Sequence, residues 1–183
     1  AEPDVGYYQN KPYIYFAPGI SILALPLYYL GKIANLAQVG AFFTISLIAI
    51  LNQIVLFAIA KHVFKLPTWT SILLTIIFAF ASTSWSYAVT LYQHHLTTFF
   101  ILSGFFAAWK YRQRVPWYPL YAVYIWAIYG LSIFVDYPNA ILLMPVMIYF
   151  FLSAFTINHQ KNGTHISFNM VLVATAIIFF LIT

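Results

Sequence analysis

The sequence predicts an all-α, polytopic membrane protein with about six transmembrane helices and one short interfacial helix. Two observations predict this class: the strongly apolar composition, and the few charges that sit between long apolar runs. Hydrophobic residues make up 63% of the 183 positions, against about 45–50% in soluble globular domains. Charged residues make up only 6%. A soluble chain of this size has too little interior for so much apolar surface, so we expect lipid to solvate it.

Five apolar runs approach the length of about 20 residues that a helix needs to cross roughly 30 Å of hydrocarbon. These runs cover about 40–60, 67–89, 93–109, 116–135 and 138–157, and a sixth run begins near residue 167. Helix-breaking residues separate several of the runs, at Pro67, Pro116, Pro138 and Gly163.

The apolar stretch 18–33 is shorter and contains Pro26 and Gly31. If it lies along the outer surface, the later helices place six of the eight Lys and Arg residues in cytoplasmic loops. The six are Lys61, Lys65, Lys110, Arg112, Arg114 and Lys161. This arrangement obeys the positive-inside rule, whereas a spanning stretch 18–33 reverses it. We therefore predict an outer segment 1–38 with an interfacial helix, followed by a transmembrane bundle 39–183.

Composition also excludes some classes of site. The chain has no cysteine, which excludes disulfides, thiolate catalysis and cysteine-ligated metals. Its cations are dispersed and form no basic helix, so we expect no nucleic acid partner. We interpret the chain as an internal piece of a longer protein, because it lacks an initial Met and stops within an apolar run.

The first candidate site residues lie in the outer segment. Pro18 is well placed to start a helix, with Gly19 in its first turn. The free N–H groups of such a helix end suit a lipid phosphate, and Lys11 and Tyr15 add donors. The alternative is an ordinary helix start within an interfacial aromatic belt.

The second group lies between the runs 67–89 and 93–109, where Tyr87 precedes the pair His94 and His95. Histidine can titrate, donate hydrogen bonds or bind a metal. Neighbouring helical residues point about 100° apart, which disfavours one metal ion shared by both rings. We name no metal ligand, although a divalent metal cofactor stays possible. Hydrogen bonding to a polar substrate and a plain interfacial pair both remain open.

Two acidic residues complete the candidate set. Asp136, followed by Tyr137, is the single acid after residue 4 and sits at the end of a run. An ionisable group near the membrane indicates function by default, but this Asp also precedes Pro138 and is a candidate helix cap. Asp4 is a weak candidate for a general base, with an exposed loop carboxylate as the alternative.

Three outer segments resemble those of the GT-C glycosyltransferases, which include protein O-mannosyltransferases and lipid A aminoarabinose transferases. The segment Tyr13-Ile14-Tyr15-Phe16-Ala17-Pro18-Gly19-Ile20, which runs on to Leu30-Gly31, is similar to the family's aromatic and proline segment beside the donor phosphate. The stretches 85–95 and 130–139 also look like members of this family. The resemblance covers nearly the whole chain.

The resemblance implies a sugar donor carried on dolichyl or undecaprenyl phosphate. An Asp of the first outer loop would deprotonate the acceptor hydroxyl, and the sugar would transfer with inversion while the lipid phosphate leaves. The family's acid lies well upstream of the proline segment, whereas Asp4 is only 14 residues before Pro18. We therefore expect the true base to precede Ala1. The acceptor would be a glycan, a lipid or a protein, on the non-cytoplasmic face of a prokaryotic plasma membrane.

A transporter or lipid flippase and a non-catalytic membrane subunit are the alternative functions. Transporters carry polar groups at the bilayer midplane, on broken helices. Here the ionisable residues cluster toward one surface, which favours chemistry on a lipid head group. Asn52 and Gln53 lie within the run 40–60, and we expect them to hydrogen-bond to a neighbouring helix.

Overall fold

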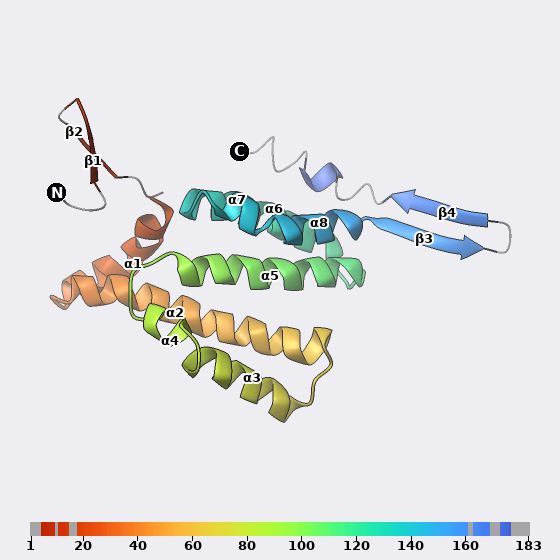
Figure 1. The fold of residues 1–183 in the computed structure, drawn as a ribbon, viewed down its shortest axis with the longest axis horizontal. Coiled ribbons are helices and arrows are strands. Elements are labelled where there is room, and N and C mark those ends of the chain that lie inside the picture. The colour runs from red at the N-terminus through yellow and green to blue at the C-terminus, as the bar shows by residue number, and fades with distance from the viewer. Residues whose placement is uncertain (1–4, 10, 15–17, 161–162, 169–172, 177–183) are drawn as a thin grey trace.

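The computed structural model describes residues 5–9, 11–14, 18–160, 163–168 and 173–176. These residues form a bundle of helices with a β-hairpin near each end of the chain (Figure 1). The first hairpin pairs β1 (Val5–Tyr8) with β2 (Lys11–Ile14), and the second pairs β3 (Phe155–Gln160) with β4 (Gly163–Phe168). The helices are α1 (Gly19–Ile33), α2 (Ala37–Ala58), the π-helical turn η1 (Ile59–Val63), α3 (Thr68–Phe80), α4 (Ser84–Tyr87), α5 (His94–Arg112), α6 (Tyr118–Val135), α7 (Asn139–Leu142) and α8 (Met144–Leu152).

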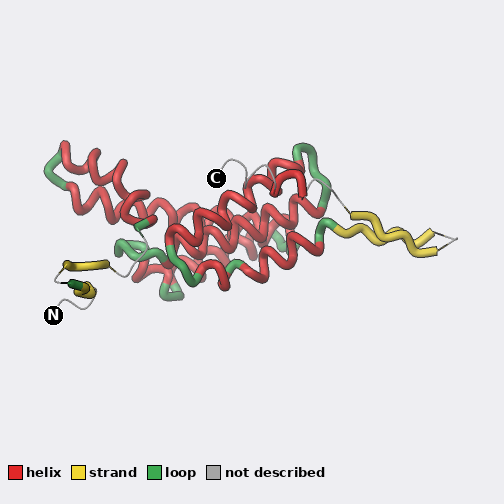
Figure 2. The backbone as a smooth tube through the Cα atoms, turned by 90° about the horizontal axis from the view of Figure 1, so that it is seen from above, coloured by secondary structure: helices red, strands yellow, loops and turns green. Residues whose placement is uncertain are grey.

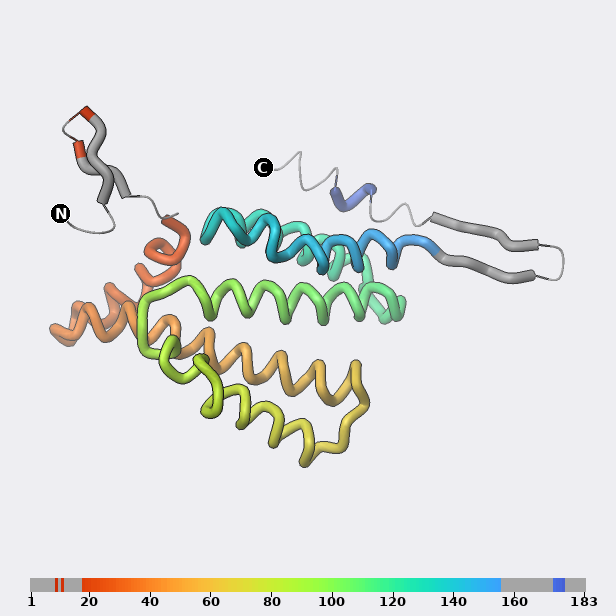
Figure 3. Tube along the Cα trace, in the orientation of Figure 1, coloured from red at the N-terminus to blue at the C-terminus, as the bar shows by residue number. Residues whose placement is uncertain are grey.

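Helix α5 lies at the centre of the bundle, between α2 on one side and α6 with α8 on the other (Figure 3). A small residue allows the close approach of α6, since a β-carbon added at Gly104 would lie 2.9 Å from the side chain of Ile128. Buried apolar side chains form one cluster among α5, α6 and α8, and a second among α2, α5 and α6. The first cluster includes Tyr111, Ile125, Trp126 and Phe150, and the second includes Ile45, Leu96, Phe100 and Ile128.

The predominantly helical class predicted from the sequence is confirmed, but the two β-hairpins were not predicted. The second hairpin extends beyond the helices in Figures 1 and 2 and replaces both the end of the predicted run 138–157 and the start of the run near 167. Asn162-Gly163 is a turn signal in the sequence, although the register pairs Gly163 with Gln160 and so places the glycine at the start of β4. Apolar content alone does not distinguish such strands from a helix.

Two helical segments are long and apolar enough to cross a membrane: Ala37–Val63, which combines α2 with η1, and α6. The first has 27 residues and, at about 1.5 Å per residue, exceeds the roughly 30 Å of hydrocarbon by about a third. Helix α5 covers the predicted run 93–109, and the remaining apolar helices are shorter. The structure thus has two candidate spans among the described residues, while the number of six stays a prediction.

The predicted run 67–89 is not one helix, because α3 ends at Phe80. Ser82 explains the break: its hydroxyl donates to the carbonyl of Phe78 at 2.6 Å and accepts from the N–H of Ser84 at 3.1 Å. A serine that satisfies local backbone groups in this way competes with the helical ladder. The chain therefore turns before the short helix α4.

The predicted run 138–157 is likewise divided, at Leu143 between α7 and α8. Pro145 lacks the N–H that would bond to the carbonyl of Ile141, so the helix cannot continue regularly at this point. Together α7 and α8 cover Asn139–Leu152.

The helix expected within 18–33 is present as α1. The chain turns at Asn35, and the first half of α2 runs back along α1 (Figure 2). Two glycines allow the pair to touch backbone to backbone. A β-carbon at Gly40 would collide with the carbonyl oxygen of Leu27, and one at Gly31 would lie 2.5 Å from the carbonyl oxygen of Leu36. The segment Ala37–Val63 is longer than a membrane span requires, and its first part pairs with α1.

The two ends of the bundle differ in charge. Helices α2 and α5 end, and α3 and α6 begin, at the end that we call the basic end (Figure 1). Its cations are Lys61, Lys65, Lys110, Arg112 and Arg114, whereas Lys161 lies outside the described residues. The opposite end, which we call the polar end, holds α4, the start of α5, the end of α6 and the start of α1.

Replacement of Gly40 by Ala tests the contact between α1 and α2. In a free helix this change stabilises by about 0.5–1 kcal/mol, but here the added carbon meets the backbone of Leu27. We expect Gly40→Ala to lower the free energy of unfolding by about 1–3 kcal/mol, measured by thermal unfolding in detergent. Gln38→Ala, at an exposed position of the same turn, is the control. A Gly40→Ala protein as stable as the parent would contradict the close contact.

Candidate functional site

The two histidines that begin α5 face different surroundings. Gln93 is the N-cap residue, so His94 and His95 occupy consecutive helical positions whose side chains diverge by about 100°. The side chain of His95 is only 4% exposed, whereas that of His94 is exposed. The sequence alone gives no means of telling which of the pair turns inward.

The buried ring of His95 joins three helices. The Nδ2 group of Asn52, from α2, donates to Nδ1 of His95 at 3.2 Å and to its backbone carbonyl at 2.9 Å. Because Nδ1 accepts, the ring proton lies on Nε2, which donates to the carbonyl oxygen of Ser84 at 2.9 Å. The prediction of a bond to a neighbouring helix is thus confirmed for Asn52 but not for Gln53, whose Oε1 is buried without a partner among the described residues. His95 has a structural role.

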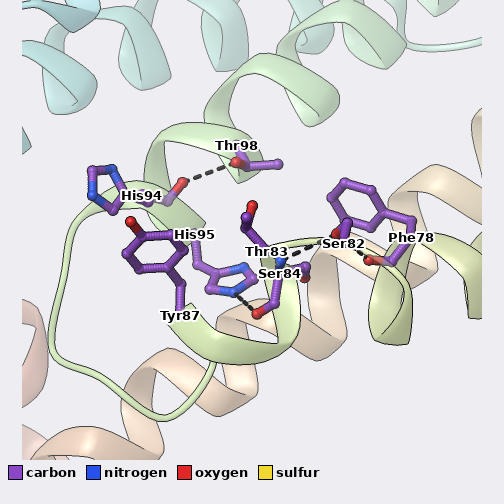
Figure 4. Close-up of a pocket in the computed structure, with 8 residues that line it drawn as sticks. All are labelled: Phe78, Ser82, Thr83, Ser84, Tyr87, His94, His95 and Thr98. Carbon is purple, nitrogen blue, oxygen red and sulfur yellow. Dashed lines mark hydrogen bonds between the residues drawn. The ribbon is translucent and has the colours of Figure 1, made fainter.

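The exposed His94 lines a cavity of about 260 Å³ between α5 and the turn that joins α3 to α4 (Figure 4). Its ring centroid lies 4.7 Å from that of Tyr87 and 5.9 Å from that of Tyr92. The cavity is lined by Phe78, Ser82, Thr83, Ser84, Tyr87, His94, His95 and Thr98. Its wall therefore combines aromatic edges with an imidazole, a phenol and several hydroxyl groups, which suit a polar, uncharged ligand.

Two hydroxyl groups of this wall already donate their protons inside the protein. Thr98 donates to the carbonyl oxygen of His94 at 2.9 Å, and Ser82 donates to that of Phe78, as Figure 4 shows. Their oxygens offer lone pairs to a ligand, whereas His94 and Tyr87 can act as donors. The cavity thus presents both donors and acceptors.

Asp136 lies on the other side of α5, just after α6 ends. Its side chain is half-buried, and its Oδ2 accepts from the Nε2 group of Gln93 at 3.4 Å. The carboxylate makes no capping bond to α7, whose N-cap is Pro138, so the capping interpretation of Asp136 is wrong. Among the described residues no salt bridge pairs this carboxylate.

A second buried amide fixes the segment around Asp136. Asn139 is fully buried, donates to the carbonyl oxygen of Ser132 at 2.9 Å and accepts from the hydroxyl of Thr97 at 3.0 Å. These bonds join α5, α6 and α7 beside the carboxylate. The role of this Asn, the last residue of the stretch 130–139, could not be predicted from the sequence, because its burial follows from tertiary packing.

The start of α1 reaches the same end of the bundle. A β-carbon at Gly19 would lie 2.7 Å from the carbonyl oxygen of Phe134 and from Cα of Val135, so this glycine permits contact with the end of α6. Pro18 is exposed at the N-cap position of α1, and Tyr137 is 62% exposed. Gly19 is therefore buried by packing, and its role in phosphate binding stays a prediction.

The remaining predicted residues lie apart from this group or outside the described residues. Lys11 is exposed at the start of β2. Asp4 and Tyr15 fall outside the described residues. In the described part of the chain, no three His, Asp or Glu side chains come close enough to hold one metal ion.

The predicted residues on α1, α4, α5 and the end of α6 therefore share one end of the bundle, but these described residues do not line one cavity. His94 and Tyr87 line the cavity beside α4, and Asp136 with Gln93 lies toward α6 and α7. The N-terminal turn of α5 separates the two groups.

Comparison with protein-family models, curated proteins and solved structures finds no match for this chain.

The adjacent histidines provide a matched pair of substitutions. His95→Ala removes the bond of the Asn52 amide to the ring and the ring's bond to the carbonyl of Ser84, and it opens a buried cavity. We expect it to lower the free energy of unfolding by about 2–4 kcal/mol, measured by thermal unfolding in detergent. His94→Ala removes an exposed ring and should change stability by less than about 0.5 kcal/mol.

A double-mutant cycle tests whether the bond itself is responsible. Asn52→Ala combined with His95→Ala should cost clearly less than the sum of the two single changes, because each removes the same interaction. Additive costs, or equal effects of the two His→Ala changes, would contradict the structural role of His95.

Proposed function

We propose that this protein is an integral membrane glycosyltransferase, or part of one, that binds the polar head of a polyprenyl-phosphate sugar and transfers the sugar to an acceptor hydroxyl. One observation carries the proposal: the exposed His94 and Tyr87 and the half-buried Asp136 gather at one end of an apolar bundle, opposite the basic end. This distribution suits chemistry at a membrane surface on a ligand whose tail is apolar.

Membrane insertion is supported by the apolar surface of the helices. Large side chains on the outside of α3 and α6 are widely exposed, among them Trp69, Ile77, Phe80, Leu120 and Leu131. Soluble monomers rarely expose contiguous apolar patches of this kind, whereas lipid favours them. The two helices of spanning length agree with this environment.

In the proposed reaction, the cavity of His94 and Tyr87 binds hydroxyl groups of the sugar. Aromatic edges and mixed donors and acceptors are suited to that surface. Asp136, oriented by Gln93, accepts hydrogen bonds from the sugar or the acceptor. Deprotonation of the acceptor is assigned to a carboxylate of the first outer loop, as the resemblance to GT-C enzymes implies. The acceptor oxygen bonds to the anomeric carbon of the sugar as the bond from that carbon to the lipid phosphate breaks. The lipid phosphate leaves, and the configuration at the anomeric carbon inverts.

The transporter and flippase alternatives are less well supported. A transport path needs polar groups that are free to meet the substrate near the bilayer midplane. The Nδ2 group of Asn52 is instead bound to His95, although its Oδ1 and the Oε1 of Gln53 are buried without partners in the described part of the chain. The Lys, Arg and Asp side chains among the described residues lie near the helix ends, in loops or in the first hairpin. This arrangement favours head-group chemistry over passage through the bundle.

Binding of undecaprenyl-phosphate mannose tests the proposal on the chain as it stands. We expect tighter binding than for undecaprenyl phosphate, because the sugar adds hydrogen bonds at the polar end. His94→Ala and Asp136→Asn should each weaken binding of the sugar lipid by about tenfold, measured by titration in detergent. Neither should change binding of the lipid phosphate without sugar.

Gln113→Ala provides the control, since Gln113 is an exposed polar residue at the opposite end of α5. It should leave both affinities unchanged. Equal affinity for the lipid phosphate with and without the sugar would refute the proposed sugar site. Unchanged affinity of Asp136→Asn for the sugar lipid would remove this residue from the proposed site.

A further inference from the structure

A large apolar groove lies on the side of the bundle toward the basic end. It has a volume of about 650 Å³, within the range of about 300–1,000 Å³ typical of small-molecule sites. Helix α5 contributes four lining residues, α6 contributes three, and α2 contributes one. The lining residues are Val55, Phe99, Ser103, Phe106, Ala107, Pro116, Trp117, Leu120, Tyr121 and Tyr124.

The surface of the groove is mainly apolar, with the phenols of Tyr121 and Tyr124 and the indole of Trp117 among its few polar groups. Its Ser103 hydroxyl is turned to the carbonyl oxygen of Phe99 at 2.6 Å, and most other lining side chains are aliphatic or aromatic. Two of them, Trp117 and Leu120, are 78% and 62% exposed, so the groove opens sideways from the bundle. An apolar chain that enters from the surrounding lipid would meet these requirements.

One end of the groove carries an unpaired positive charge. Phe106 lines the groove, and the Nζ atom of Lys110, one helical turn further on, lies 5.4 Å from the centroid of its ring. Among the described residues Asp136 is the sole carboxylate, and it lies at the polar end, so Lys110 has no acidic partner there. Trp117, in the loop between α5 and α6, is of the residue type that settles at the level of lipid head groups.

We propose that this groove binds one acyl chain of an anionic phospholipid from the leaflet at the basic end, with the lipid phosphate held near Lys110. An apolar slot that ends at an unpaired cation is complementary to a lipid with a negative head group. The site is separate from the polar end, so it is not the site proposed for the sugar donor. The inference rests on the membrane insertion argued above but not on glycosyl transfer.

The test uses the full chain in detergent and counts the lipids it retains by native mass spectrometry. Phosphatidylglycerol and phosphatidylcholine of the same acyl chains are added in competition. We expect phosphatidylglycerol to be retained at least fivefold more, because a single basic residue near a membrane surface favours anionic lipid by about that factor. Equal retention of the two lipids would overturn the proposal.

Two pairs of variants distinguish the contribution of the Lys110 charge to lipid retention from that of the apolar groove. Lys110→Gln should abolish most of the preference for phosphatidylglycerol, whereas Arg112→Gln should preserve it, because its guanidinium lies over the ring of Tyr149 instead of Phe106. Leu120→Trp should fill the groove and reduce retention of both lipids. Leu131→Trp, at another exposed position of α6 that does not line the groove, should not.

Equal effects of Lys110→Gln and Arg112→Gln would mean that the preference for phosphatidylglycerol depends on overall positive charge and not on Lys110. That result would overturn the proposed site. Unchanged retention in Leu120→Trp would also overturn it. The measurement reports lipid retention and not sugar transfer, so its failure is distinguishable from failure of the transferase proposal.

Discussion

The buried bond between Asn52 and His95 is the constraint on which the polar end of the molecule depends. In hydrocarbon a polar group without a protein partner costs several kcal/mol, because no water can replace that partner. The imidazole meets this requirement by accepting from α2 and donating to the carbonyl of Ser84. The bond from His95 to Ser84 holds α4 against α5, and with it the shape of the cavity that Tyr87 shares with His94.

The residues in the first two turns of α5 have different roles because their side chains point in different directions. His95 and Thr97 turn inward and bind buried partners on α2, α4 and α7. His94 and Thr98, on another face, line the open cavity, and Gln93 reaches toward Asp136. One short segment thus combines rigid attachment to three neighbouring helices with exposed groups. This combination is what a binding surface requires, since supported side chains lose little freedom when a ligand arrives.

The same helix links two chemically different ends. Its start carries uncharged polar groups near a lone carboxylate, and its end carries Lys110 and Arg112 with their charges resting on aromatic rings. Cations beside aromatic rings at the end of an apolar helix are typical of a membrane interface. The separation of the charges lets one bundle engage different parts of the lipid environment at its two ends.

Much of the helical arrangement could be predicted from the sequence. The apolar runs predicted α2, α5 and α6 within a few residues. The bond of Asn52 to a neighbour was also predictable, because an amide within an apolar run needs a partner. These features depend on local composition and on rules that hold wherever the chain is placed.

Other features depend on contacts between distant segments. Only tertiary packing decides that His95 is buried while His94 is exposed, since the two residues are identical and adjacent. The same holds for Asn139, which lies between Thr97 and Ser132, and for Gly19, which meets the end of α6. Apolar content could not distinguish the hairpin of β3 and β4 from a helix, because short strands and buried helices have similar apolar content. The sequence by itself determined the apolar helices and the charge of each end, whereas the tertiary structure decided which polar side chains face a ligand, because burial is a property of neighbours and not of residue type.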